Sequence, residues 1–382
     1  MVSFEELKAF YRGKKVLVTG HTGFKGSYLT VLLGLLGAKV YGYALKAGTD
    51  PCLFDILYGS GVSSRSETQL HVRLPGGQSP VESISESHIA DIRDMDELEA
   101  FYNRTEPDIV LHLAAQPIVR EGYRIPRETY EINVMGTVNL LECVRRNPCC
   151  RSFLNVTTDK VYLNEERPDY AYREEDKLDG YDPYANSKSC SELVTHSYSS
   201  SFLKAAGVAV STARAGNVIG GGDFSPDRII PDCVRAAVSR RTIVVRNPYS
   251  VRPYQFVLEP LYVYLMIAMK QAEDPSYAGW YNVGPDTEDC VTTGKLCDLF
   301  MSSYGEGLRW ETPAQPSGPH EAGLLKLDNG KLKKTFGWKP VWHMDRTVRA
   351  ITDWTKAWVQ SNETANEELI RQIHEFTLTG SI

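Results

Sequence analysis

The sequence lacks the short motifs of several common enzyme classes. It contains no H-E-x-x-H, no P-loop and no G-x-S-x-G, so the signatures of zinc proteases, P-loop NTPases and α/β-hydrolases are excluded. Its eight cysteines form no C-x-x-C and no Cys/His spacing of a zinc site. We therefore expect reduced thiols, as in a cytoplasm, and no protein-bound metal.

Long apolar runs and an excess of positive charge are also absent. The longest apolar stretch, residues 28–40, is interrupted by Thr30, Gly34, Gly37 and Lys39 and is too short to span a membrane. The first 15 residues lack the apolar core of a signal peptide. The net charge of −6, from 42 Lys and Arg against 48 Asp and Glu, argues against nucleic acid as the main partner. We predict a cytoplasmic protein that binds neither membrane nor nucleic acid.

The sequence is instead rich in short β-branched runs that alternate with longer amphipathic segments. Its 382 residues favour two domains over one. We expect strands at residues 15–19, 39–44, 109–113, 152–157 and 208–213, and helices at residues 27–37, 127–146 and 185–206. Such alternation is typical of βαβ units. It predicts an α/β fold with a doubly wound parallel sheet.

Two stretches depart from this alternation. Residues 50–87 are rich in Gly, Ser and Pro and are predicted to form a long loop. After about residue 219 the pattern breaks into Gly-, Pro- and Asp-rich loops and short helices. We therefore expect the parallel sheet in residues 1–215, with 242–280 returning to it, and a smaller, mixed C-terminal lobe in residues 216–241 and 281–382.

A glycine-rich turn stands between the first expected strand and helix. Gly20, Gly23 and Gly26 recur every three residues, in the context that a dinucleotide-binding fingerprint requires. Such glycines let the backbone turn tightly and approach a pyrophosphate at the helix N-terminus. The end of the second strand, residues 42–46, has no Asp or Glu for a ribose 2′-hydroxyl, and it contains Lys46. The motif predicts a Rossmann-type NAD or NADP site and leaves that choice open.

A tyrosine and a lysine begin the helix expected near residue 185. Tyr184 and Lys188 are four residues apart, so both side chains face the same side of a helix. A nearby ammonium stabilises a phenolate and lowers the pKa of the phenol. Such a phenol can exchange a proton with a sugar hydroxyl during hydride transfer.

Three chemically different side chains follow the strand at residues 152–157. Thr158, Asp159 and Lys160 are consecutive, and the carboxyl ends of parallel strands are where open α/β sheets bind ligands. They offer a hydrogen bond, an acid and a base. A turn with a local Asp–Lys ion pair is the alternative interpretation.

These motifs together resemble the extended short-chain dehydrogenase/reductase family, and within it the CDP-glucose 4,6-dehydratases. The resemblance extends from about residue 14 to 358 and weakens in residues 50–87. The stretches that carry it are TGHTGFKGSYL, HLAAQPIVR, NVMGTVNLLE, TTDKVY, DPYANSK, ARAGNVIGGGDFSPDRIIPD, RNPYSVRPYQFVLEP and LLKLDNGKLKKTFGW.

The resemblance implies a role for each matching residue. NAD would be bound by Gly20, Thr22, Gly23, Phe24, Lys25, Gly26, Asp91, Ile92, Leu113, Ala114, Ala115 and Gln116, together with Tyr184 and Lys188. Hydride transfer would use Thr158, Tyr184 and Lys188, with Asp159 as the acid and Lys160 as the base of the elimination. The nucleotide-sugar would contact Gln116, Asn133, Asn217, Arg228 and Arg252, the last three from the smaller lobe.

The implied reaction is dehydration of CDP-D-glucose to CDP-4-keto-6-deoxy-D-glucose by C4 oxidation, C5/C6 elimination and C6 reduction. A sugar-nucleotide 4-epimerase, a dehydratase for GDP-, UDP- or TDP-sugars and a redox-inactive NAD-binding protein are the alternatives. Asp159 and Lys160 favour a dehydratase, although the similar TDP-glucose enzymes have a glutamate where Lys160 stands. The resemblance also implies deoxysugar biosynthesis for lipopolysaccharide O-antigen, and a homodimer or dimer of dimers paired through the helices at 127–146 and 185–206.

Overall fold

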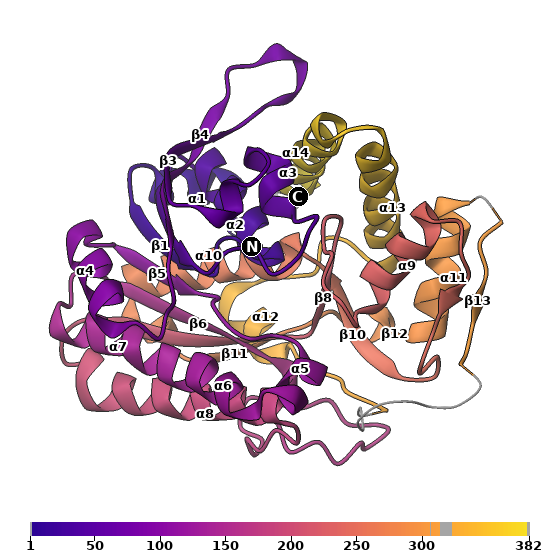
Figure 1. The fold of residues 1–382 in the computed structure, drawn as a ribbon. Coiled ribbons are helices and arrows are strands. Elements are labelled where there is room, and N and C mark those ends of the chain that lie inside the picture. The colour runs from indigo at the N-terminus through magenta and orange to yellow at the C-terminus, as the bar shows by residue number, and fades with distance from the viewer. Residues whose placement is uncertain (1, 306, 314–322, 380–382) are drawn as a thin grey trace.

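A computed structural model describes residues 2–305, 307–313 and 323–379, and an eight-stranded sheet lies at its centre (Figure 1). The strands follow the order β11 (Trp280–Val283), β7 (Ala209–Ala215), β6 (Ser152–Thr158), β5 (Ile109–His112), β1 (Lys15–Thr19), β2 (Lys39–Ala44), β4 (Val81–Ile89) and β3 (Glu67–Val72). Every neighbouring pair is parallel except β3 with β4. The strand order reverses between the parallel neighbours β1 and β5. This reversal confirms the doubly wound Rossmann-type fold.

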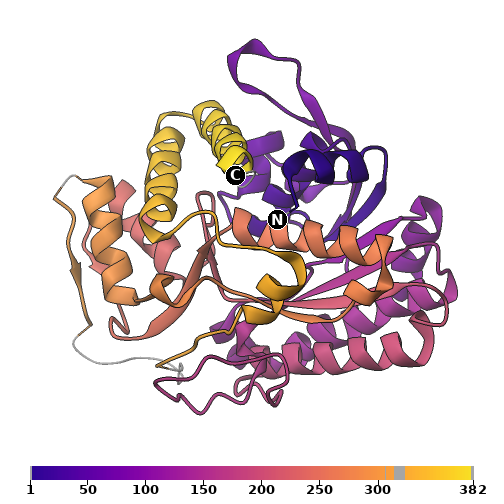
Figure 2. The same cartoon turned by 180° about the vertical axis from the view of Figure 1, so that it is seen from behind.

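Helices cover both faces of this sheet, as Figures 1 and 2 show. One face carries α1 (Phe4–Tyr11), α2 (Phe24–Leu35), α3 (Leu53–Tyr58), α10 (Leu258–Glu273), α12 (Gly330–Phe336) and α14 (Asn362–Thr379). The other carries α4 (Met95–Thr105), α5 (Val119–Arg124), α6 (Pro126–Tyr130), α7 (Gly136–Arg146) and α8 (Pro183–Tyr198). The central strands are buried on both faces, which explains their continuous β-branched runs.

The two long helices expected from the sequence are present but contain π-helical turns. Residues 127–146 run through α6, the π turn η3 (Glu131–Met135) and α7. Helix α8 continues into a second π turn, η5 (Ser199–Leu203). Each π turn inserts an extra residue without ending the helix. Both segments therefore remain helical over the lengths expected from the sequence.

The long loop predicted for residues 50–87 is wrong. This stretch contains α3, β3 and most of β4, which form a helix and a hairpin at one edge of the sheet. Strand β3 is largely exposed and polar, so it lacks the alternation of apolar and polar residues by which a strand is recognised. In Figure 1 the hairpin tip projects from the top of the molecule.

The smaller lobe contains a three-stranded sheet and three helices. Strand β10 (Val251–Phe256) pairs with β8 (Asn217–Ile219) and β12 (Cys290–Thr292), while β13 (Trp310–Glu311) pairs with β9 (Ile243–Val244). Helices α9 (Ile229–Val238), α11 (Thr293–Tyr304) and α13 (Met344–Gln360) pack around them. Among the described residues, no helix is both long and apolar enough to cross a membrane.

Strand pairing divides the chain differently from the predicted domain limits. Residues 243–256 belong to the small sheets, and α10 and β11 rejoin the large sheet. Helix α14 also packs against α3 of the first lobe, although residues 281–382 were assigned to the second; residues 380–382 lie outside the described part. We therefore propose that the segment returning to the first lobe begins at about residue 257.

Candidate active site

A cleft of about 580 Å³ lies between the two lobes, at the carboxyl ends of β6 and β7. Its walls include Phe24, Lys25, Thr158, Asp159, Lys160, Tyr184, Asn217, Arg228 and Arg252, all residues predicted for the site. Four separate regions of the sequence therefore face one cavity: the end of the glycine-rich turn, the motif at Thr158, the motif at Tyr184 and the smaller lobe. This is the crevice in which open α/β sheets bind ligands.

The glycine-rich turn leaves no room for side chains where β1 enters α2. Gly20 has φ +76°, and a Cβ there would lie 2.8 Å from the backbone nitrogen of Ala114. A Cβ on Gly26 would lie 2.2 Å from the carbonyl oxygen of Gly20. Gly23 precedes α2 and provides no side-chain cap, so the N-terminus of this helix is open to an anion. The turn thus fits the pyrophosphate of a dinucleotide.

The remaining residues predicted to bind the cofactor lie along the same edge of the sheet. Asp91 and Ile92 follow β4, and Ile92 packs against Gly136 of α7. The Asp91 carboxylate pairs with Arg93 at 2.6 Å, and this contact lowers its pKa. Leu113 and Ala114 follow β5 and donate backbone hydrogen bonds to Thr19 at the end of β1.

Gln116 and Asn133 form a buried anchor beneath the cleft. The Asn133 amide accepts a bond from the Gln116 backbone nitrogen at 2.8 Å and donates to the Ser187 hydroxyl at 2.9 Å. The Gln116 side chain is bonded to Thr129 and Ile118. Neither residue belongs to the cleft lining, so their contact with substrate stays a prediction, whereas their hold on the loop after β5 is structural.

Tyr184 and Lys188 share one face of α8. Asp182 caps this helix by accepting a bond from the Ala185 nitrogen at 2.9 Å. Burial raises the pKa of Tyr184 to about 12, and hydrogen bonding with Thr158 opposes that shift. Burial lowers the pKa of Lys188 to about 8, and its ammonium donates to the Val156 carbonyl at 3.1 Å. The ammonium is thus buried against β6, and Lys188 does not belong to the cleft lining among the described residues.

Thr158 and Asp159 lie at the end of β6, beside Tyr184. The Thr158 hydroxyl donates to Asp159 Oδ1 at 2.9 Å. Burial raises the pKa of Asp159, which favours a protonated acid. Its Oδ2 is buried and has no hydrogen-bond partner among the described residues. Lys160 follows in the short helical turn η4 (Asp159–Val161) and lines the cleft.

The wall formed by the smaller lobe carries both arginines and aspartates, with Arg228 and Arg252 among the arginines. Arg228 lies 3.5 Å from Asp223, and Arg252 is buried. Lys25, on the opposite wall, has its pKa lowered to about 7 by burial and by the positive charges of Lys188 and Arg228. Such a concentration of cations suits a diphosphate.

Sequence reasoning missed two further arginines of the cleft. Arg120 of α5 and Arg246 of the smaller lobe approach the carboxylate of Asp227 at 3.6 and 2.9 Å. They connect the two lobes across the cleft. Arg246 stands in the stretch RNPYSVRPYQ, whose density of arginine was the available signal.

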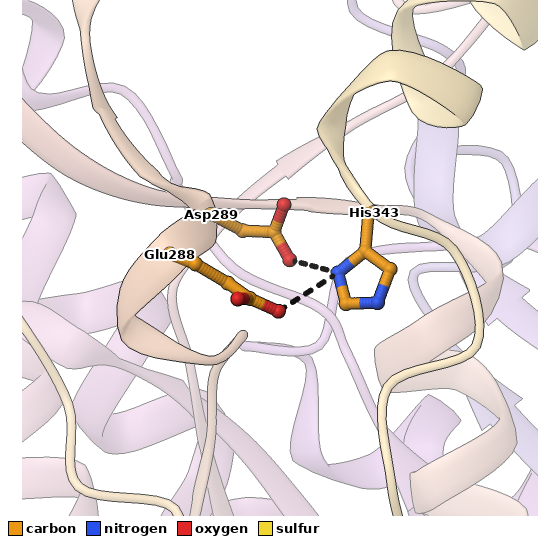
Figure 3. Close-up of side chains that lie close together, drawn as sticks. All are labelled: Glu288, Asp289 and His343. Atoms are coloured by element: carbon orange, nitrogen blue, oxygen red, sulfur yellow. Dashed lines mark hydrogen bonds and ion pairs between the residues drawn. The ribbon is translucent and has the colours of Figure 1, made fainter.

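A cluster of two carboxylates and a histidine, drawn in Figure 3, lies outside the cleft lining. His343 Nδ1 is 2.8 Å from Asp289 and 3.5 Å from Glu288. Asp289 also accepts a bond from the Met344 nitrogen at the start of α13. The Asp289 contact raises the pKa of His343. The cluster therefore ties the loop before β12 to the N-terminus of α13.

The fold and the site together define an extended short-chain dehydrogenase/reductase. Phe24, Lys25 and Tyr184 line one cleft at the edge of a Rossmann-type sheet, and Lys188 is buried one helical turn beyond Tyr184. Residues 17–351 match the family model described as GDP-mannose 4,6 dehydratase, and the chain belongs to this family.

Individual relatives agree with this assignment. The chain is 42% identical over 362 residues to CDP-glucose 4,6-dehydratase of Salmonella typhimurium, covering 93% of this chain and 94% of that protein. It is 24% identical to GDP-mannose 4,6 dehydratase 2 of Caenorhabditis elegans, covering 88% of each. Among solved structures, dTDP-glucose 4,6-dehydratase of Bacillus anthracis in complex with NAD has a TM-score of 0.69 at 20% identity, over 90% of this chain and 97% of that one. UDP-glucuronic acid 4-epimerase of Bacillus cereus has a TM-score of 0.72 at 20% identity, over 90% and 99%. These two structures support the fold.

Proposed function

We propose that this protein is an NAD-dependent hydro-lyase that converts CDP-D-glucose to CDP-4-keto-6-deoxy-D-glucose and water. The observation that carries the proposal is the position of Asp159 and Lys160 in the same cleft as Tyr184. An epimerase has no need of this second acid–base pair. The 42% identity to the Salmonella enzyme over nearly the whole of both chains supports CDP-glucose as the substrate.

NAD is the proposed cofactor, and when bound it accepts a hydrogen from C4 of the sugar and returns it to C6. The turn at Gly20, Thr22, Gly23, Phe24, Lys25 and Gly26 would hold its pyrophosphate, Asp91 and Ile92 its adenosine, and Leu113, Ala114, Ala115 and Gln116 the path toward the sugar. The close contacts of Gly20 and Gly26 support this fit. Asn217, Arg228 and Arg252 would hold the nucleotide diphosphate of the substrate.

The side chains of the cleft account for each proton in this reaction. Tyr184 removes the proton of the C4 hydroxyl, while the Lys188 ammonium stabilises the phenolate. The 4-ketone acidifies the C5 hydrogen, and Lys160 takes that proton. Lys160 then returns a proton to C5 when hydride is delivered to C6. Asp159, whose pKa is raised by burial, acts as the acid and gives a proton to the C6 hydroxyl as water leaves. Thr158 orients Asp159 through their hydrogen bond.

Incubation with CDP-glucose is expected to yield a ketone whose mass is lower by one water, without added reductant. Substrate deuterated at C4 should deliver its label to C6 of the same molecule, because the hydrogen removed from C4 stays bound until it is returned. Mass spectrometry of mixed labelled and unlabelled substrate measures this. Transfer of label between molecules, or an isomer of unchanged mass, would contradict the proposal; UDP-, GDP- and TDP-glucose serve as comparison substrates.

The proposed assembly is a homodimer or a dimer of dimers, paired through the helices at residues 127–146 and 185–206. Both carry exposed apolar side chains: Met135 is 50% exposed, Leu193 54% and Phe202 45%. A paired four-helix arrangement would bury these side chains.

Light scattering at micromolar protein is expected to give at least a dimeric mass, and Leu193→Glu should reduce it toward the monomer. Leu378→Glu is the matched control, because Leu378 is 72% exposed on α14, away from both helices. A monomeric wild type, or equal loss with both variants, would overturn this assembly. A cytoplasmic location and a place in deoxysugar biosynthesis for O-antigen complete the proposal.

A further inference from the structure

A buried ion pair lies directly behind the catalytic lysine. Glu192 follows Lys188 by one turn of α8, and its side chain is fully buried. It lies 3.0 Å from the guanidinium of Arg214 in β7, which is also buried. A buried ion pair is weak evidence for a contribution to stability, because desolvating two charges costs about as much as their attraction returns. Its position next to the active site therefore needs a different explanation.

Both oxygens of the Glu192 carboxylate accept hydrogen bonds from strands whose carboxyl ends form the cleft. Glu192 Oε1 accepts from the Thr157 hydroxyl at 2.5 Å, and Thr157 immediately precedes Thr158. Glu192 Oε2 accepts from the Thr212 hydroxyl at 2.7 Å as well as from Arg214. The carboxylate thereby joins α8, β6 and β7 at the level of the cleft floor.

Arg214 extends the network to β11, the edge strand of the large sheet. Its guanidinium donates to the Tyr162 hydroxyl at 2.8 Å and to the Glu174 carbonyl at 2.9 Å. Tyr162 in turn donates to Asn282 of β11 at 2.6 Å. This guanidinium lowers the pKa of Glu192 to about 2 despite complete burial, so the ion pair favours the charged carboxylate.

We propose that Glu192, paired with Arg214, is a positioning residue that places a carboxylate one helical turn from Lys188 and aligns the end of β6 that carries Thr158 and Asp159. This inference rests on the proposed role of Lys188 in activating Tyr184. Glu192 is the charged group that opposes the effect of burial on Lys188.

Other ionisable groups face the same region. His112 of β5 feels the Lys188 charge, but burial lowers its pKa to about 3, so it remains neutral. Lys25 of α2 also feels Lys188 and titrates near pH 7. On the Glu192 side, His196 lies 3.3 Å from the carboxylate and Tyr162 faces it from beyond β6. These groups are common to wild type and variant, so a difference between the two proteins reports the Glu192 charge.

Glu192→Gln keeps the size of the side chain and removes its charge. A negative charge favours protonated neighbours, so its loss should move the alkaline limb of the kcat–pH profile, where Lys188 deprotonates, to lower pH by about one unit. At pH 8, close to the Lys188 pKa of about 8, kcat should fall about fivefold, with a smaller change in KM. Thr212→Val is the matched control: it removes a neutral hydrogen bond to the same carboxylate and should leave the position of the limb unchanged.

The double variant Glu192→Gln/Arg214→Met serves where the single variant does not fold, because it leaves no unpaired buried charge. The same shift is expected. An unmoved alkaline limb in the folded variant, or an equal shift with Thr212→Val, would overturn the inference. The profile is measured with whichever of CDP-, UDP-, GDP- and TDP-glucose wild type turns over fastest. If CDP-glucose is not the substrate, the wild-type comparison of the four nucleotide-sugars shows this, independently of any shift caused by the Glu192 variant.

Discussion

Replacing Tyr184 with phenylalanine is expected to lower kcat by roughly 10²–10⁴-fold, or about 3 to 5 kcal/mol of barrier. The phenol lines the cleft and shares a helix face with Lys188. Burial raises its pKa to about 12, and hydrogen bonding with Thr158 and the positive charge of Arg228 oppose that rise. Phenylalanine keeps the ring and removes the group that exchanges the proton, so steady-state kinetics should show the loss in kcat more than in KM.

Tyr264→Phe is the matched control for this variant. Tyr264 is completely buried, its hydroxyl has no hydrogen-bond partner among the described residues, and it does not belong to the cleft lining. It should retain kcat within a few fold. A Tyr184→Phe protein that remains folded and turns over within tenfold of wild type would remove this tyrosine from the proposed chemistry.

Replacing Lys160 with methionine is expected to stop the reaction after C4 oxidation. The side chain keeps its length and loses the base, and loss of a general base costs roughly 10²–10⁴ in rate. Elimination should therefore become limiting, and the absorbance of reduced nicotinamide should accumulate on the enzyme during turnover. Wild type in D₂O should place one solvent deuterium at C5 of the product, and Lys160→Met should do so at a correspondingly lower rate.

Two outcomes would contradict the assignment of Lys160 as the base of the elimination. Turnover of Lys160→Met near the wild-type rate would show that Lys160 is not the base. Lys25 is the other lysine among the described residues of the cleft lining, so accumulation of reduced nicotinamide with Lys25→Met instead would assign the base to the glycine-rich turn. Lys177→Met is the control, because Lys177 is an exposed lysine paired with Asp179.

Local spacing was sufficient to predict much of this molecule. Strands 15–19 and 39–44 lie where β-branched residues predicted them, because a strand buried on both faces must be apolar throughout. The pair Tyr184 and Lys188 follows from helix geometry alone. The β3–β4 hairpin was missed because an exposed edge strand has no burial to imprint a pattern on its sequence.

Contacts between distant segments could not be predicted in the same way. Glu192 and Arg214 are 22 residues apart, and no periodicity connects a residue in a helix with one in the next strand. Gln116 and Asn133 were predicted to contact substrate, and only their mutual hydrogen bonds identify an anchor beneath the cleft. Arg120 and Asp227 come from different lobes, so their proximity depends on how the lobes meet.

The α/β class, the glycine-rich turn and the chemical identity of the reactive side chains could be predicted from the sequence. These depend on backbone geometry and residue type within a few positions. The three-dimensional arrangement was needed to show which of these groups share a cavity, which have shifted pKa values and which form hydrogen bonds within the protein. Burial and charge set pKa values, as at Asp159 and Lys188, and both are properties of the neighbours that folding brings together, not of the residue itself.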